Sequence, residues 1–103
     1  MNTPTIQVDD QGVRRDLANG RVESVTGEEL VEVSILTTSD GPFVQDVFFV
    51  LEGRNDTDCL VPQAAPESSV LLERLQRLPG FDNEALIRAM SSTDEQRFVC
   101  WRR

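Results

Sequence analysis

Residues 74–90, RLQRLPGFDNEALIRAM, carry the clearest structural signal in the chain, because two helical patterns meet there at a sharp break. Before the break, leucines recur at intervals of three and four residues, which predicts an amphipathic helix of about three turns over residues 67–78. Residues 78–81, LPGF, fit a type II turn, since proline presets φ at its second position and glycine accepts a positive φ at its third. The chain is therefore expected to turn and enter a second helix at once.

The second helix is expected to begin just after Asp82, whose carboxylate can accept hydrogen bonds from the free amides of the first turn. Phe81 and Leu86 have the spacing of a hydrophobic staple, which fixes the angle at which the chain enters the helix. A DNA-reading helix-turn-helix needs an exposed and mostly basic second helix, but this one offers a single arginine, Arg88. We therefore interpret the break as a scaffold joint, with both helices covering one face of a sheet.

Apolar runs before and after the helices predict β-strands. In residues 31–35 apolar and polar side chains alternate, as in a strand with one face on the core. Residues 47–51, VFFVL, are continuously apolar, which fits a central strand covered on both faces. Residues 19–20, Asn-Gly, are a strong hairpin signal, and residues 97–102 have the composition of a last strand.

Together these patterns predict a single α+β domain over residues 1–103, a length that suits one domain. Its sheet is expected to be a curved antiparallel sheet of about six or seven strands. The two C-terminal helices are expected to pack on this sheet, and a final C-terminal strand follows them.

Charge is distributed unevenly along the chain, which has 18 acidic residues, ten arginines, no lysine and no histidine, for a net charge of −8. The first 60 residues hold twelve of the acids and four of the arginines, whereas residues 61–103 hold six of each. Binding to nucleic acid or to an anionic membrane requires a clustered positive field, so neither is an expected partner. An acidic, strand-rich half favours a basic protein partner.

No apolar run reaches the roughly 18 residues of a membrane helix, and the first residues, MNTPTIQVDD, lack the pattern of a signal peptide. We therefore expect a cytoplasmic protein in which the two cysteines, Cys59 and Cys100, are buried reduced thiols. Two cysteines without histidine do not suffice for a standard tetrahedral zinc site, and no cofactor is expected.

The residue types required by several kinds of catalysis are missing. Without histidine and tyrosine the chain cannot form a Ser-His-Asp or Cys-His nucleophilic system, and without lysine it has neither a Schiff base nor a Walker-type phosphate loop. Any enzymatic chemistry would depend on carboxylates, arginines, serines or the two thiols. The chain is therefore expected not to be an enzyme.

Acidic loops supply the remaining candidates for a site. Asp56 and Asp58 lie in the oxygen-rich segment RNDTD, but the other ligands of a calcium loop do not follow, so a solvated hairpin loop is expected. Asp40 and Asp46 flank residues 41–43 and would hold a metal or substrate if that loop folded back. Asp40 is more simply explained as a turn residue.

Two aromatic residues, Phe43 and Trp101, would form an interface hot spot if both were exposed. Trp101 on a last strand is more often part of a core, with Arg102 and Arg103 extending into solvent. The candidate interaction surface consists of Asp40, Phe43, Asp46, Asp56, Asp58 and Trp101.

From Leu36 to Trp101, about two-thirds of its length, the chain resembles a group of short bacterial proteins of unassigned function. An order of motifs carries the resemblance: TTSDGPFVQDVFFVLEG, LVPQ, LLERLQRLPGFDNEALIRAM and RFVCW. The resemblance implies no activity, cofactor or site residue.

Residues 12–37, GVRRDLANGRVESVTGEELVEVSILT, are weakly similar to the opening of bacterial pleckstrin-homology-like and GRAM-like domains. In those domains a short polar segment precedes a strand with the pattern Leu-x-x-Val. Leu30 and Val33 match this pattern. The chain lacks their basic phosphoinositide loop and continues past its first helix into a second helix and a strand. The similarity therefore implies a pleckstrin-homology-like sheet and no lipid site.

The leading hypothesis is a non-enzymatic, acidic protein-binding module, of which an inhibitor or immunity-type protein would be one form. The alternative is a small carboxylate- and metal-dependent hydrolase, with Asp40, Asp46, Asp56 or Asp58 as magnesium or calcium ligands. A homodimer formed by edge pairing of the last strand is a third hypothesis.

Overall fold

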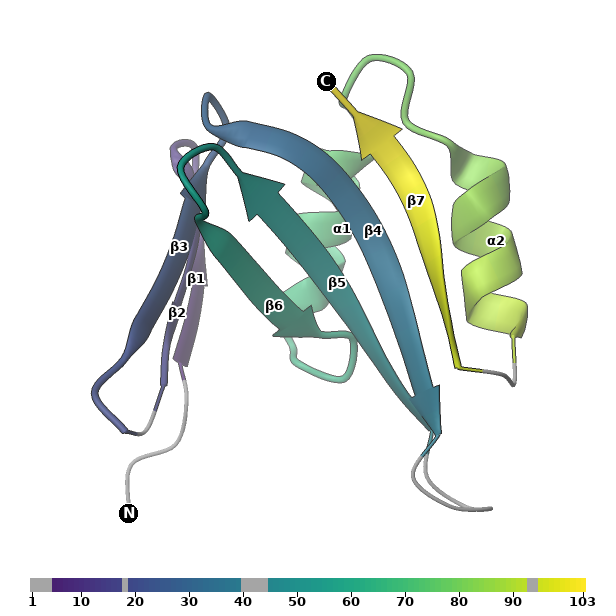
Figure 1. Ribbon diagram of the computed structural model, residues 1–103, viewed down its shortest axis with the longest axis horizontal. Helices are drawn as coiled ribbons and strands as arrows, with labels where there is room; N and C mark the ends of the chain where they lie inside the picture. Colours follow the sequence, from purple (N-terminus) through teal and green to yellow (C-terminus); the bar gives the residue numbers. More distant parts are fainter. Residues whose placement is uncertain (1–4, 18, 40–44, 93–94) are drawn as a thin grey trace.

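The computed structural model describes residues 5–17, 19–39, 45–92 and 95–103, which form seven β-strands and two α-helices (Figure 1). In chain order the elements are β1 (Thr5–Val8), β2 (Gly12–Asp16), β3 (Val22–Thr26), β4 (Leu30–Ser39), β5 (Gln45–Gly53), β6 (Asp58–Pro62), α1 (Ser68–Leu75), α2 (Asn83–Ser91) and β7 (Gln96–Arg102). The predicted α+β class is confirmed, with both helices late in the chain and a final strand after them.

The strands are divided between two antiparallel sheets and do not form the single curved sheet expected from the sequence. One sheet has the order β1-β2-β3, and the other has the order β6-β5-β4-β7. The division falls at the turn after β3, where the Thr26 amide donates to Glu29 Oε1 at 3.2 Å and the Glu29 amide donates to Thr26 Oγ1 at 3.2 Å. This reciprocal pattern is that of a capping box, and here it turns the chain from one sheet into the other.

The three-stranded sheet lies beside β6, the outermost strand of the larger sheet (Figure 1). Its β2–β3 hairpin turns at Gly20, where φ is +87°, as the Asn-Gly signal predicts. Arg15 Nη1 donates to the Leu60 carbonyl at 3.1 Å, and the Leu60 amide donates to Glu23 Oε1 at 3.2 Å. Side chains of the smaller sheet thus bond the backbone groups that β6 turns away from β5.

β7 completes the larger sheet by pairing antiparallel with β4, so that Arg102 lies opposite Glu32. The register shifts by one residue at Cys100, which has no partner on β4 and forms a β-bulge. α2 lies beside β7 (Figure 1), and the Asp82 amide donates to the Cys100 carbonyl at 2.7 Å. The connection between the helices therefore binds directly to the last strand.

The core lies between the four-stranded sheet and the two helices, which pack on the same face of this sheet as predicted (Figure 1). The sheet contributes Val33, Ile35, Phe49, Leu51, Cys59 and Val61, and the helices contribute Leu71, Leu75, Ala85, Leu86 and Ala89. Removal of these apolar side chains from water is the main force that holds the helices on the sheet.

β5 differs from the prediction that both of its faces are covered. Phe49 and Leu51 are buried against the helices, whereas Phe48 and Val50 point to the other face and are half-buried. The described part of the chain forms two helices and both cover one face, so neither of them covers the second face of β5.

α1 is shorter than predicted, since it ends at Leu75 and the expected helix extended to Leu78. The amides of Arg77 and Leu78 donate to the carbonyls three residues back, at 3.2 and 3.0 Å, as in a tightened 3₁₀ turn. Proline disfavours the helical conformation in the residue before it, so the helix changes to a turn ahead of Pro79.

The joint between the helices has the predicted geometry. Gly80 has φ +82°, and the Phe81 amide donates to the Leu78 carbonyl at 3.1 Å, which are features of a type II turn. Asp82 is the N-cap of α2, and its Oδ1 accepts a hydrogen bond from the Ala85 amide at 3.1 Å. The scaffold-joint interpretation of this segment therefore agrees with the structure.

Candidate functional site

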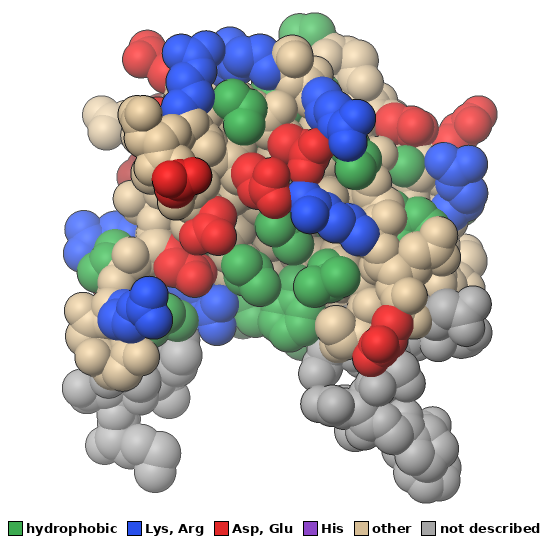
Figure 2. Space-filling model, viewed as in Figure 1, with side chains coloured by type: hydrophobic (Ala, Val, Ile, Leu, Met, Phe, Trp, Pro, Cys, Tyr) green, Lys and Arg blue, Asp and Glu red, His purple; other side chains and the backbone are tan. Residues whose placement is uncertain are grey.

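The face of the four-stranded sheet turned away from the helices carries a group of apolar side chains (Figure 2). Between β4 and β5, Leu36 lies opposite Phe48. Between β5 and β6, Val50 lies opposite Leu60. Val99 on β7 lies opposite Ser34, so it belongs to the same face. All five apolar side chains are half-buried. We call this surface the open face, and it consists of Glu32, Ser34, Leu36, Phe48, Val50, Glu52, Asp58, Leu60, Arg97, Val99 and Arg102.

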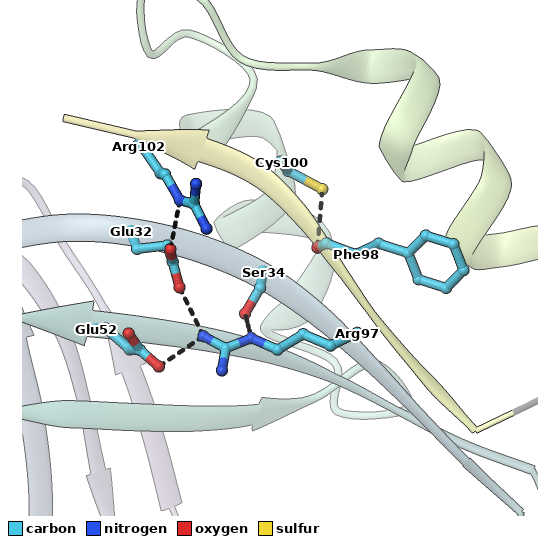
Figure 3. A network of polar contacts seen from close by, with 7 residues as sticks. All are labelled: Glu32, Ser34, Glu52, Arg97, Phe98, Cys100 and Arg102. Atoms are coloured by element: carbon cyan, nitrogen blue, oxygen red, sulfur yellow. Dashed lines mark hydrogen bonds and ion pairs between the residues drawn. The ribbon is translucent and has the colours of Figure 1, made fainter.

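Charged side chains border the apolar group on the open face and form a connected network (Figure 3). Arg97 Nη2 donates to Glu32 Oε2 and to Glu52 Oε1, each at 2.6 Å, and Arg97 Nε donates to Ser34 Oγ at 3.0 Å. Arg102 Nε donates to the other oxygen of Glu32 at 2.7 Å. One arginine therefore joins three strands, because Glu32 and Ser34 lie on β4, Glu52 lies on β5 and Arg97 lies on β7.

Glu32 is the most constrained acid of this network. The hydrogen bond from Arg102 and the charges of Arg97 and Arg102 hold the pKa of Glu32 below its ordinary value of 4.5, against the opposing effect of burial. Glu32 and Glu52 are direct cross-strand partners, and two carboxylates in such positions repel each other. The position of Arg97 between them compensates this repulsion.

The network changes the charge distribution expected from the sequence. β7 comes from the neutral C-terminal part of the chain, yet its arginines pair with acids of the N-terminal part because β7 lies next to β4. Arg74 of α1 pairs in the same way with Asp10, at 3.2 Å. The excess of negative charge belongs to the whole chain, and on the open face acidic and basic side chains are interspersed (Figure 2).

Asp56, one of the predicted surface residues, lies in the turn between β5 and β6, and Asp58, another, is the first residue of β6. Asn55 and Asp56 have φ of 62° and 59°, and the Thr57 amide donates to the Arg54 carbonyl at 3.3 Å, so the hairpin-loop interpretation is confirmed. Asp56 and Asp58 are exposed and line an open groove of about 310 Å³ together with Arg21 and Glu23.

The other loop candidates are only partly described. Asp40 and Phe43 lie outside the described residues, and for Asp46 the structure describes the backbone alone, which pairs with Thr38. Within the described part of the chain, no group of three or more Cys, Asp or Glu residues is placed to hold a metal ion.

Trp101 lies away from the open face and therefore does not share a surface with Asp58. It pairs with Val33, whose side chain is in the core, and its indole Nε1 donates to the Pro79 carbonyl at 2.9 Å. The Arg103 guanidinium stacks on the indole ring, 5.8 Å from its centroid. The half-buried Trp101 thus ties the last strand to the joint between the helices.

Both cysteines are free and buried, as predicted. Burial raises the pKa of Cys59 to about 12 and that of Cys100 to about 11. A thiol with such a pKa stays protonated near neutral pH, so neither cysteine is prepared to act as a nucleophile.

The residues of the open face other than Asp58 were not among the candidates taken from the sequence. A signal for them was present in residues 47–51, VFFVL, because a strand with one buried face needs apolar side chains only at alternate positions. No comparable local signal places Arg97 between two glutamates, since that contact depends on the pairing of β7 with β4.

None of the helices in the described residues has both the length and the apolar character required to span a membrane. No family model matches the chain, no curated protein matches its sequence, and no solved structure matches its fold.

Proposed function

We propose that the chain is a non-enzymatic binding module that docks a basic protein partner on its open face. The observation that carries this proposal is the apolar group formed by Leu36, Phe48, Val50, Leu60 and Val99 on a sheet face that has no helix over it in the described residues. The solvent face of an antiparallel sheet usually carries polar side chains, so apolar side chains there favour contact with another molecule.

The charges around the apolar group favour a basic partner. Asp58 is exposed at the start of β6, and Glu52 beside it is shared with Arg97. The whole chain has a net charge of −8, so its long-range field attracts cations and repels anions. A partner with apolar side chains at its centre and lysines or arginines around them would match this surface in both respects.

Composition supports a binding function over catalysis. The chain has no histidine, lysine or tyrosine, which supply most general bases and many nucleophiles in enzymes. Burial raises the pKa values of Cys59 and Cys100, so both thiols stay protonated near neutral pH and are poor nucleophiles.

The proposal can be tested by comparing the same substitution on two faces of the molecule. Val50→Ser places a hydroxyl in the middle of the open face, whereas Val70→Ser changes an exposed valine of α1, on the helix side, which has 46% of its surface accessible. Each immobilised variant and the wild type would capture proteins from a lysate at low salt, and quantitative mass spectrometry would compare the proteins that a high-salt wash then releases.

We expect a basic protein that the wild type and Val70→Ser retain at low salt, that high salt releases, and that Val50→Ser fails to retain. Equal capture by all three chains, or capture that depends on Val70 and not on Val50, would contradict the proposal.

A further inference from the structure

A second concavity lies on the helix side of the molecule, where the β1–β2 turn meets α1, and it shares no residue with the open face. Its volume is about 170 Å³. Aliphatic side chains from both sheets and from α1 form its wall, among them Val8, Val25, Leu30, Leu51, Leu71 and Leu75.

The pocket is open to solvent on one side, and its inner wall is formed by side chains of the core. An apolar cavity of about 150 Å³ in another protein stays dry and binds benzene, so a pocket of about 170 Å³ has room for a ring of that size. Its aliphatic wall offers water few hydrogen-bond partners, which favours an apolar occupant.

The mouth of the pocket has no side chain at two positions. Gly27 lines the mouth, and a Cβ built on it meets no atom within 4 Å. Gly12 also lines the pocket, and its Cβ would lie 2.3 Å from the Val25 carbonyl oxygen, so no larger residue fits there without moving the strand.

Three charged residues surround the mouth. Arg74 Nη1 donates to the Asp9 carbonyl at 3.1 Å, and Arg74 Nη2 donates to Asp10 Oδ1 at 3.2 Å. The Asp10 side chain is 97% exposed, so this ion pair is strongly screened by water and is easily exchanged for another. Asp9 Oδ1 accepts hydrogen bonds from the amides of Gln11 and Gly12, at 2.9 and 3.0 Å, and stays in the turn.

The sum of these charges decides between ligand head groups. Two acids and one arginine line this pocket, and the chain as a whole carries −8. A cationic head group is therefore attracted to the mouth, and an anionic head group is repelled. We propose that this pocket binds a small ligand consisting of a ring-sized apolar group and an amine, with the ring among the aliphatic side chains and the ammonium group beside Asp10.

Three probes with the same ring and different head groups test the proposal: benzylamine, benzyl alcohol and benzoate. Each would be titrated into the ¹⁵N-labelled chain at neutral pH and low salt, and amide shifts of the lining residues would give the dissociation constants. We expect all three to shift amides of β1, β3 and α1, with benzylamine bound about two- to fivefold more tightly than benzoate, as expected for an exposed charge contact. Absence of binding by all three, or tightest binding by benzoate, would overturn the proposal.

Variants separate the pocket from the head-group contact. Val8→Phe places a larger side chain in the wall and should weaken all three probes at least tenfold, and Leu78→Phe offers a second way to fill the pocket if the first variant does not fold. Asp10→Asn should bring the affinities of benzylamine and benzoate closer together and leave benzyl alcohol unchanged.

Glu73→Gln is the matched control, because Glu73 is an exposed acid of α1 that pairs with Arg77 and does not line the pocket. It should leave the benzylamine-to-benzoate ratio as in the wild type. A ratio that changes equally in Asp10→Asn and Glu73→Gln would assign the preference to the overall charge and overturn the placement of the amine beside Asp10.

Discussion

The two faces of the four-stranded sheet are made by alternate residues of the same strands, and both are rich in apolar side chains, but only one of them is buried. Val33, Ile35, Phe49 and Leu51 on the helix side are 0–2% exposed, whereas Phe48 and Val50 on the open face are half-buried. The difference arises because the described residues form two helices and both pack on one face. Residue type alone therefore does not tell which apolar face of a sheet belongs to the core and which remains available.

Adjacent phenylalanines give the most direct test of this comparison. Phe49→Ala removes a ring that is 1% exposed and should lower the free energy of unfolding by about 3–5 kcal/mol. Phe48→Ala removes the same ring from the open face and should cost no more than about half as much, because Phe48 already contacts water in the folded chain. Urea denaturation of both variants measures the difference, and equal losses would mean that the open face is covered.

A smaller effect is expected from the ion network of the open face. Arg97→Gln leaves Glu32 and Glu52 opposite each other without the cation between them, and should lower the free energy of unfolding by about 1–2 kcal/mol at low salt. Addition of Glu52→Gln to this variant should restore part of the loss, since it removes one of the two opposing charges. A loss that neither salt nor the second substitution reduces would show that Arg97 acts through packing.

The smallest expected effect is the contribution of Glu32 to the pH dependence of stability. Because its pKa in the folded chain is lowered from 4.5, Glu32 stabilises the fold above that pH, and this contribution is lost as the pH falls through the lower folded value. Between pH 6 and pH 3, Glu32→Gln should therefore lose less stability than the wild type.

Glu73→Gln, which removes one charge from exposed α1, provides the control for this experiment. Thermal unfolding at a series of pH values measures all three chains. If Glu32→Gln and the wild type lose the same stability on acidification, Glu32 is not a source of the acid sensitivity.

Local features of the fold could be predicted from the sequence. The Leu78–Phe81 turn, the Asp82 cap and the Gly20 hairpin each depend on the conformational preferences of a few neighbouring residues, and each is present. The division into two sheets could not be predicted, because a Thr26–Glu29 hydrogen-bond pattern normally marks the start of a helix and here joins two strands.

The candidate site was predicted less completely. Asp58 does border the open face, but Trp101 lies on the core side of β7, where an indole hydrogen bond holds it to Pro79. The charge pattern along the sequence was also a poor guide to the surface, since Arg97 and Arg102 reach acids that are more than forty residues away in the chain. Such long-range pairing is set by sheet register, which short sequence patterns do not contain.

The contacts of Leu60 with Arg15 and Glu23 have a consequence for self-assembly. Its amide and carbonyl are already satisfied by one acceptor and one donor from the chain's own side chains, so an incoming β-strand would have to displace both before it could add to β6. At the opposite edge of the sheet, the Asp82 amide donates a hydrogen bond to the Cys100 carbonyl of β7. Strand-by-strand growth into fibrils is therefore opposed at both ends of the sheet, although the apolar open face stays available to a partner.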